Sequence, residues 1–172
     1  MKFDFPQVDL PCEILAWNDV TEDILNIYKQ SCRLKAGIFA ICTEGKMTAT
    51  INLIDYEIKP NDLITLLPGT IIQFRERTEK VRLCFAGFSS ECVERINLIK
   101  SMVSSFSKIT ECPIVELQED IASYLIDYFS LLARVTCDEK LSLPSEMTEV
   151  SLRSILTAVG LIYQRYSSKN HN

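Results

Sequence analysis

Short apolar runs separated by turn-forming residues fill the chain from Gly37 to Phe88. The separators are Glu44-Gly45, Lys59-Pro60-Asn61-Asp62 and Pro68-Gly69, and Gly, Pro, Asn and Asp are residues that turns favour. Short strands joined by turns at such regular spacing are typical of a β-sandwich or barrel. This stretch therefore predicts about five or six strands around a common core.

The clearest alternation runs from Lys46 to Ile54, where successive residues point to opposite faces of a strand. One interpretation is that the polar row lines a pocket, and the other is that it faces solvent while the apolar row fills the interior. The pattern favours the second interpretation, which leaves the barrel interior apolar. The apolar row is Met47, Ala49, Ile51 and Leu53, and the polar row is Thr48, Thr50 and Asn52.

Beyond Ser89-Ser90 the apolar spacing changes to that of helices. We expect a first helix with one of these two serines as its N-cap, ending before Cys112-Pro113. A second helix is expected from about Val115 to Val135, and a third from about Ser145 to Tyr166. Residues 167–172 are polar and predict a tail that does not continue the last helix.

The lead-in, residues 1–36, contains two apolar segments, Ile14–Trp17 and Ile24–Tyr28, each of which fits a strand or an irregular cover. Asp and Pro residues interrupt its start, so it lacks the apolar core of a signal peptide. No apolar run approaches the ~18 residues of a membrane span. We therefore expect a cytoplasmic protein without a membrane partner.

The charge balance speaks against direct binding of nucleic acid. The formal net charge is −5, and this balance gives no electrostatic reason to expect contact with phosphates. Binding to a phosphate backbone requires clustered Lys and Arg. If the protein acts on DNA, we expect residues outside this chain to make the contact.

Residues that could carry chemistry are sparse. The only histidine is His171, in the polar tail, and the seven cysteines include no C-x-x-C pair. A zinc site or a Cys-His nucleophile has little to build on here, and thiols within apolar runs behave as small hydrophobic side chains. Asp62 and Glu57 lie beside turn residues, where carboxylates commonly cap the backbone or face water. We therefore expect no catalytic residue, metal or cofactor, and no enzyme.

Five segments of the chain form a recognisable set: Ala40–Gly45, Ile51–Ile58, Lys59–Gly69, Gln73-Phe74 and Cys84–Ser89. Together they resemble the N-terminal effector-binding and dimerisation domain of AraC-family transcription regulators. The resemblance covers roughly residues 35–166 and implies an α+β fold, a cupin-like antiparallel β-barrel of jelly-roll type followed by C-terminal α-helices.

The resemblance also implies a division of the chain. Residues 1–110 would form the barrel with its lead-in and first helix, residues 111–166 a helical dimerisation layer, and residues 167–172 a tail toward a DNA-binding domain. Members of the family carry two helix-turn-helix motifs after the sensor domain, and this chain ends where they would begin. Metal-binding cupins place His and Glu on the barrel strands, and this sequence has no such histidine. The expected partners are thus a second copy of the chain, a small-molecule effector and, through the absent domain, DNA.

Three groups of residues each have a functional and a structural interpretation. Arg75, Arg77 and Arg82 could anchor a carboxylate effector or belong to a solvated charged loop. Trp17 and Phe39 could stack on a ligand or pack in the core. The last helix could hold a second subunit or only complete the monomer core. The predicted pocket residues are Phe39, Ile41, Met47, Ala49, Ile51, Phe74 and Arg82, and the predicted dimer residues are Leu152, Ile155, Leu156, Val159, Ile162 and Tyr163.

The resemblance favours a ligand-sensing and dimerisation domain of a transcription regulator. Two other functions fit the same pattern. One is a stand-alone, metal-free cupin enzyme such as an isomerase or epimerase, and the other is a pure oligomerisation module whose barrel is filled by its own side chains.

Overall fold

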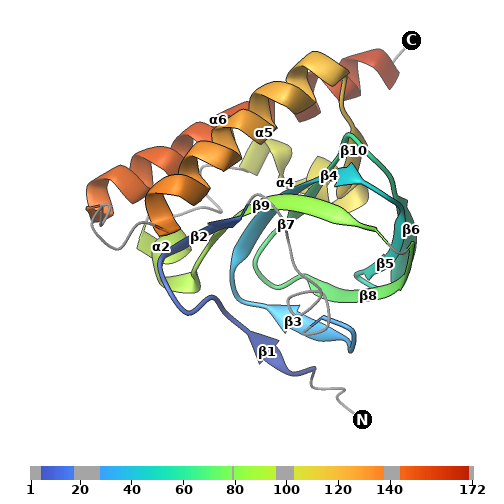
Figure 1. Ribbon diagram of the computed structural model, residues 1–172, viewed down its shortest axis with the longest axis horizontal. Coiled ribbons are helices and arrows are strands. Elements are labelled where there is room, and N and C mark those ends of the chain that lie inside the picture. Colours follow the sequence, from blue (N-terminus) through green and yellow to red (C-terminus); the bar gives the residue numbers. More distant parts are fainter. Residues whose placement is uncertain (1–4, 18–27, 79, 96–102, 138–143, 171–172) are drawn as a thin grey trace.

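The strands form two five-stranded sheets that face each other and curve into a barrel, with long helices across one side (Figure 1). The computed structural model describes residues 5–17, 28–78, 80–95, 103–137 and 144–170. The α+β class and the order of barrel first and helices last are confirmed. In chain order the described elements are β1 Gln7–Val8, β2 Ile14–Trp17, β3 Cys32–Leu34, β4 Gly37–Glu44, β5 Met47–Ile51, β6 Ile54–Ile58, β7 Asp62–Leu66, β8 Ile71–Arg77, β9 Arg82–Phe88, α2 Ser90–Arg95, α4 Val103–Glu111, β10 Ile114–Glu116, α5 Glu119–Cys137 and α6 Ser145–Asn170.

One sheet has the strand order β1-β3-β8-β5-β6, and the other has the order β10-β7-β4-β9-β2. Neighbouring strands are antiparallel except for β1 and β3, which run parallel. The N-terminal lead-in thus contributes an edge strand to each sheet, β1 to the first and β2 to the second. The predicted strand or cover at Ile14–Trp17 is a strand, whereas most of Ile24–Tyr28 lies outside the described residues.

Strand β4 lies between two apolar layers, so both of its faces are buried. Ile38 and Ala40 point into the space between the sheets, and Phe39 and Ile41 point toward the helices. The first layer is the barrel interior, and the second joins the outer face of the β4 sheet to α2, α4, α5 and α6. Each layer is held together by removal of apolar surface from water.

The predicted strand from Lys46 to Ile54 ends early. Asn52 and Leu53 have φ values of 49° and 70°, so they form a tight turn between β5 and β6. Two successive residues with positive φ suit the twist of a two-residue hairpin. Leu53 consequently projects outward, 72% exposed, while Met47, Ala49 and Ile51 are buried as predicted.

Two predicted helix limits are also wrong. Residues 114–116 form strand β10, which pairs with β7, and the next helix begins at Glu119 instead of Val115. The last helix continues through residues 167–170 to Asn170. Polar residues cost a helix less than ~1 kcal/mol each, so the loss of the apolar face does not end it. The predicted helix after Ser89-Ser90 is described in two parts, α2 and α4, and residues between them lie outside the described ranges.

Candidate functional site

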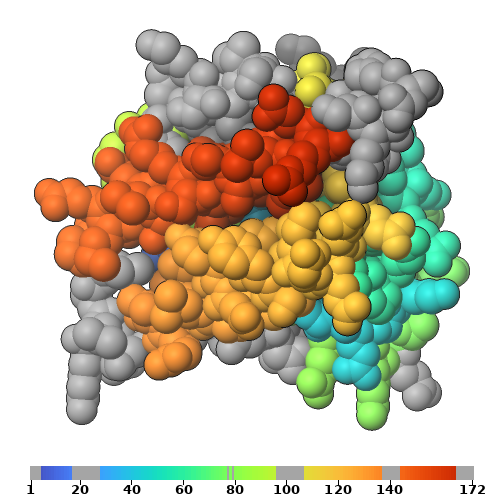
Figure 2. All heavy atoms as spheres, turned by 90° about the horizontal axis from the view of Figure 1, so that it is seen from above, coloured from blue at the N-terminus to red at the C-terminus, as the bar shows by residue number. Residues whose placement is uncertain are grey.

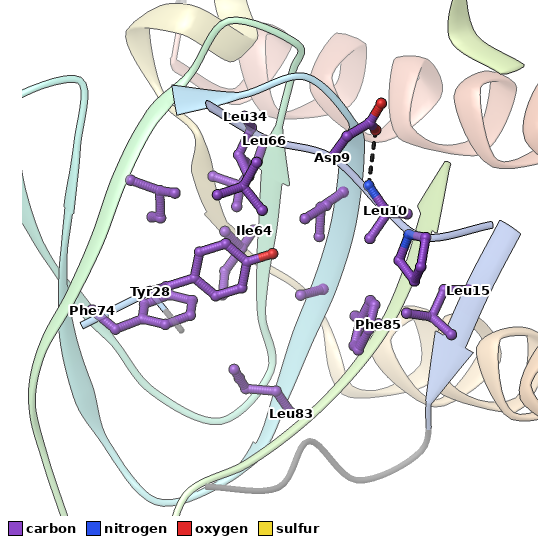
Figure 3. A pocket seen from close by; sticks show the side chains of 15 residues that line it. Asp9, Leu10, Leu15, Tyr28, Leu34, Ile64, Leu66, Phe74, Leu83 and Phe85 are labelled. Carbon is purple, nitrogen blue, oxygen red and sulfur yellow. Dashed lines mark hydrogen bonds between the residues drawn. The ribbon is translucent and has the colours of Figure 1, made fainter. Parts of the chain in front are cut away.

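A cavity of about 240 Å³ lies between the two sheets, beneath the N-terminal segment (Figure 3). Its walls come from strands β2, β3, β4, β7, β8 and β9 together with the segment around β1. Thirteen of the fifteen lining side chains are hydrocarbon, and the other two belong to Asp9 and Tyr28. The lining residues are Val8, Asp9, Leu10, Pro11, Leu15, Tyr28, Leu34, Ile38, Ala40, Ile64, Leu66, Ile72, Phe74, Leu83 and Phe85.

Tyr28 is fixed at the cavity wall by strand β8. Its carbonyl oxygen accepts a hydrogen bond from the Phe74 backbone N–H at 2.8 Å, and the two rings meet edge to face with centroids 5.7 Å apart. The Gln73 side chain holds the following residues, donating to the Lys29 carbonyl oxygen and accepting from the Ser31 hydroxyl. Figure 3 shows the Tyr28 hydroxyl pointing away from Phe74 into the space that the other lining side chains surround.

The segment that covers the cavity is tied to helix α2. The Asp9 carboxylate accepts hydrogen bonds from the backbone N–H of Ser90 at 3.1 Å and from its hydroxyl at 2.5 Å. Leu10 lies so close to Gly87 of β9 that a Cβ at position 87 would come within 2.8 Å of its methyl group. Partial burial raises the pKa of Asp9, but the hydrogen bonds from Ser90 and Leu10 and the charge of Lys35 outweigh it, and the net pKa lies below its usual value.

The same segment is tied to helix α6 through an arginine. Arg95, the last residue of α2, forms an ion pair with Glu13 of the segment and another with Glu149 of α6, the latter at 2.6 Å. These hydrogen-bonded carboxylates raise the pKa of Arg95 above its usual range. The Glu13 carbonyl oxygen also accepts a hydrogen bond from the Ser89 backbone N–H at 3.0 Å. Residues 9–15 therefore contact the cavity with some side chains and hold the helices with others.

The predicted pocket residues are spread over four places. Phe74 lines the cavity. Met47, Ala49 and Ile51 lie in the barrel interior but outside the cavity wall, and Phe39 and Ile41 lie on the helix side of β4. Arg82 is exposed and lies 3.4 Å from the Glu44 carboxylate. Whether any of these residues binds a ligand stays a prediction.

The sequence reasoning missed most of the wall, above all Leu10, Tyr28 and Leu34. Leu10 is one apolar residue between Asp9 and Pro11, and Leu34 sits in a three-residue strand, so neither shows a periodic pattern. The one available signal was the tyrosine at the end of an apolar segment in the lead-in.

The predicted dimer residues are buried by their own chain. Leu152, Ile155, Leu156, Val159 and Tyr163 are at most 6% exposed, and Ile162 is partly buried against the same layer. The Tyr163 hydroxyl donates to the carbonyl oxygen of Cys112 at 2.7 Å. As placed here, this row completes the monomer core, which was the alternative interpretation of the last helix.

The outer face of α5 and α6 is apolar and exposed, and of the predicted dimer residues Ile162 reaches it. The two helices lie side by side on the surface (Figure 2), and a groove of about 430 Å³ runs over them and the end of β10. Tyr124 and Leu161, 66% and 56% exposed, line this groove from the two helices, and Leu131 of α5 is exposed beyond it. Exposed apolar side chains grouped in this way mark interaction surfaces more often than scattered ones do.

The side chains with catalytic potential in the sequence are the carboxylates of Asp62 and Glu57 and the thiols of the cysteines. The Asp62 carboxylate accepts a hydrogen bond from the Lys59 backbone N–H at 2.9 Å and so closes the turn before β7, while Glu57 is exposed. Burial raises the pKa of Cys84 to about 12 and that of Cys42 to about 11, which disfavours the nucleophilic thiolate. Within the described ranges, no group of three or more His, Cys, Asp or Glu is placed to hold a metal ion. None of the described helices is long and apolar enough to cross a membrane.

Comparison with known proteins gives distant structural likenesses. No family model and no curated protein matches the chain. Among solved structures it is similar to the AraC-like transcriptional activator CuxR, at 9% identity and a TM-score of 0.42, over 85% of this chain and 47% of that one. It is also similar to ToxT from Vibrio cholerae, at 10% identity and a TM-score of 0.40, over 93% and 54%.

A further ToxT structure, from Vibrio cholerae O395, holds (E)-4-(8-methylnaphthalen-1-yl)but-3-enoic acid and is similar at 10% identity and a TM-score of 0.43, over 87% and 57%. The chain spans about half the length of these solved structures. CuxR, by its description, is of the family that the sequence resembles. Likenesses this distant do not establish a function.

Proposed function

We propose that this chain is the ligand-sensing and dimerisation domain of an AraC-type transcription regulator in the cytoplasm. DNA would be bound by a helix-turn-helix segment outside these 172 residues. The observation that best supports the proposal is the double role of residues 9–15, which cover an apolar cavity and also hold helices α2 and α6. A sensor requires such a connection, because a ligand shifts the equilibrium between two conformations of a protein only if it interacts differently with each of them.

In this mechanism the occupant of the cavity acts on Leu10, Pro11 and Leu15. A shift of this segment would change the Asp9–Ser90 hydrogen bonds at the start of α2. It would also change the Glu13–Arg95–Glu149 contacts that reach α6. The orientation of α6 would then differ between the empty and the occupied domain, and a segment following α6 would receive that difference.

For the dimer we propose the exposed face of α5 and α6 in place of the buried row. Tyr124 and Leu161 in the groove and Leu131 beyond it are available without unfolding the core, and the groove offers a concave, mainly apolar surface. A two-fold axis across the helices would bring the same patch of both copies together, as in most soluble dimers. Both copies would then pass on their state through the same helices that contact each other.

A reporter assay tests the proposal as a whole. The chain is fused to a DNA-binding half that represses a reporter only as a dimer. We expect repression with the wild type, loss of repression with Tyr124→Arg or Leu161→Lys, and no change with Ile54→Lys. Ile54 is a matched control because it is an exposed apolar residue, 58% exposed, on β6.

An inactive fusion together with a monomer in light scattering at every concentration would refute the dimerisation role. A reading frame without a basic helix-turn-helix segment after residue 172 would refute the link to DNA. Turnover of a small molecule by the purified chain would instead favour the metal-free enzyme.

A further inference from the structure

The Tyr28 hydroxyl is the one polar side-chain group that the described wall directs into the cavity. It has no hydrogen-bond partner among the described residues, although its ring and backbone are fixed by Phe74. The other polar lining residue, Asp9, uses its carboxylate to accept hydrogen bonds from Ser90, and Figure 3 shows that carboxylate turned away from Tyr28. An unpartnered hydroxyl above an apolar cavity is a directional donor for whatever enters.

The described wall contains no Lys, Arg or His. An ionised carboxylate in this cavity would lose its hydration without gaining a counter-ion, which is strongly unfavourable. A sugar would also be disfavoured, because each hydroxyl that meets a hydrocarbon wall loses a hydrogen bond to water. The lining therefore selects for a neutral and mainly apolar molecule.

The volume limits the size of that molecule. At about 240 Å³ the cavity is smaller than the ~300–1,000 Å³ typical of sites for drug-sized ligands.

Burial, followed by the influence of Cys32, raises the pKa of Tyr28 above its usual value near 10. The hydroxyl accordingly keeps its proton at neutral pH and can donate it to an acceptor.

We propose that the cavity binds a small, neutral, apolar molecule with a single hydrogen-bond acceptor, such as a ketone, ester or lactone, and that the Tyr28 hydroxyl donates to this acceptor. The inference rests on the proposed function in that it takes the cavity as the sensing site. It adds the chemical class of the ligand and names the residue that recognises its polar group.

Three probes with the same phenyl-alkyl skeleton test the ligand class: 4-phenyl-2-butanone, butylbenzene and 3-phenylpropanoate. Their affinities for the 172-residue chain are measured at pH 7 by calorimetry, and a thermal shift provides a second readout. We expect the ketone and the hydrocarbon to bind. The carboxylate should bind at least about tenfold more weakly than the ketone, because its charge is left without a partner.

Tyr28→Phe isolates the hydrogen bond. It should lower the ratio of ketone to hydrocarbon affinity by about threefold to tenfold, which is the range for one hydrogen bond, and leave the hydrocarbon affinity unchanged. Tyr128→Phe is the matched control, since Tyr128 is a tyrosine of α5 that lines neither the cavity nor the groove of the proposed dimer face. It should leave all three affinities as in the wild type.

Three results would overturn the inference: a carboxylate that binds more tightly than the ketone, an affinity ratio that Tyr28→Phe does not change, or no binding of any probe at millimolar concentration. The reporter fusion distinguishes failure of this inference from failure of the proposed function. Repression that still depends on Tyr124 and Leu161 would leave the domain a dimeric regulator whose ligand belongs to another class.

Discussion

The carboxylate of Asp9 caps the first turn of helix α2 by accepting hydrogen bonds from both the backbone N–H and the hydroxyl of Ser90. The two residues are 81 positions apart in the sequence. Because Asp9 also lines the cavity, this contact joins the cover of the cavity to the helical layer.

Asp9→Ala should lower the free energy of unfolding by about 0.5–1.5 kcal/mol, because two donors at the start of α2 lose their acceptor. Asp127→Ala is the matched control: Asp127 is an exposed carboxylate on α5, and its loss should change stability by less than about 0.5 kcal/mol. Urea denaturation followed by circular dichroism measures both variants. Equal stabilities of the two variants would show that the cap contributes nothing.

The same contact predicts a dependence on pH. The pKa of Asp9 is lower in the folded chain than its ordinary value near 3.8, so folding favours the ionised carboxylate. Its contribution to stability is fully present above about pH 5 and is lost as the pH falls through the folded pKa. The difference in melting temperature between wild type and Asp9→Ala should therefore be constant from pH 5 to 7 and shrink below about pH 4. A difference that grows on acidification would contradict this assignment.

The period-two pattern of the barrel could be predicted from the sequence, but the turn that ends it could not. Met47, Ala49 and Ile51 are buried as their alternation predicts. Leu53 continues the alternation in the sequence, yet it adopts a positive φ, which is uncommon for a leucine and which periodicity does not encode. The prediction therefore extended the strand through the turn.

The cavity could not be predicted because pairing between distant segments creates it. Its wall depends on β2 lying beside β9 and on β3 lying beside β8, and both strands belong to a lead-in of irregular composition. In β4 every residue from Gly37 to Cys42 is buried, so the sequence does not distinguish the cavity side, Ile38 and Ala40, from the helix side, Phe39 and Ile41. A strand buried on both faces loses the signal that orients an exposed one.

The hairpin between β5 and β6 carries strain at Leu53. A left-handed conformation costs a side chain with a Cβ about 1–2 kcal/mol, and glycine avoids this cost. Leu53→Gly should raise the free energy of unfolding by about 0.5–1 kcal/mol after the larger chain entropy of glycine is deducted. Ile54→Gly, in the extended strand β6 next to it, should instead lower stability. Thermal denaturation of the two variants checks the opposite signs, and a loss of stability in Leu53→Gly would refute the argument.

Thr65 is a second position where the native residue is not the most stable choice. Its side chain is 1% exposed, and its hydroxyl oxygen has no hydrogen-bond partner in the described part of the chain. Thr65→Val keeps the shape and removes the unpaired group, so we expect about 1 kcal/mol of added stability. Thr70→Val is the control, since the Thr70 hydroxyl donates to the Leu67 carbonyl oxygen at 2.6 Å, and its loss should destabilise by a similar amount. Urea denaturation would contradict the prediction if both variants lost stability.

Substitutions in helix α6 allow effects on folding and effects on dimer formation to be measured separately, because Ile155 and Leu161 lie on different faces of the helix. Ile155 is 1% exposed and Leu161 is 56% exposed. Ile155→Ala should cost about 2–5 kcal/mol of stability through the cavity it leaves, as in other cores. Leu161→Ala should cost less than about 0.5 kcal/mol in the monomer but weaken the proposed dimer, because it removes an apolar contact that only the partner covers.

The two effects are measured by urea denaturation at low protein concentration and by light scattering across a concentration series. An unchanged dimer in Leu161→Ala, together with an unchanged dimer in Tyr124→Arg, would remove this face as the interface. A dimer that dissociates in Ile155→Ala while the monomer stays fully folded would restore the buried row to that role, since only a rearranged α6 could then present it to a second copy.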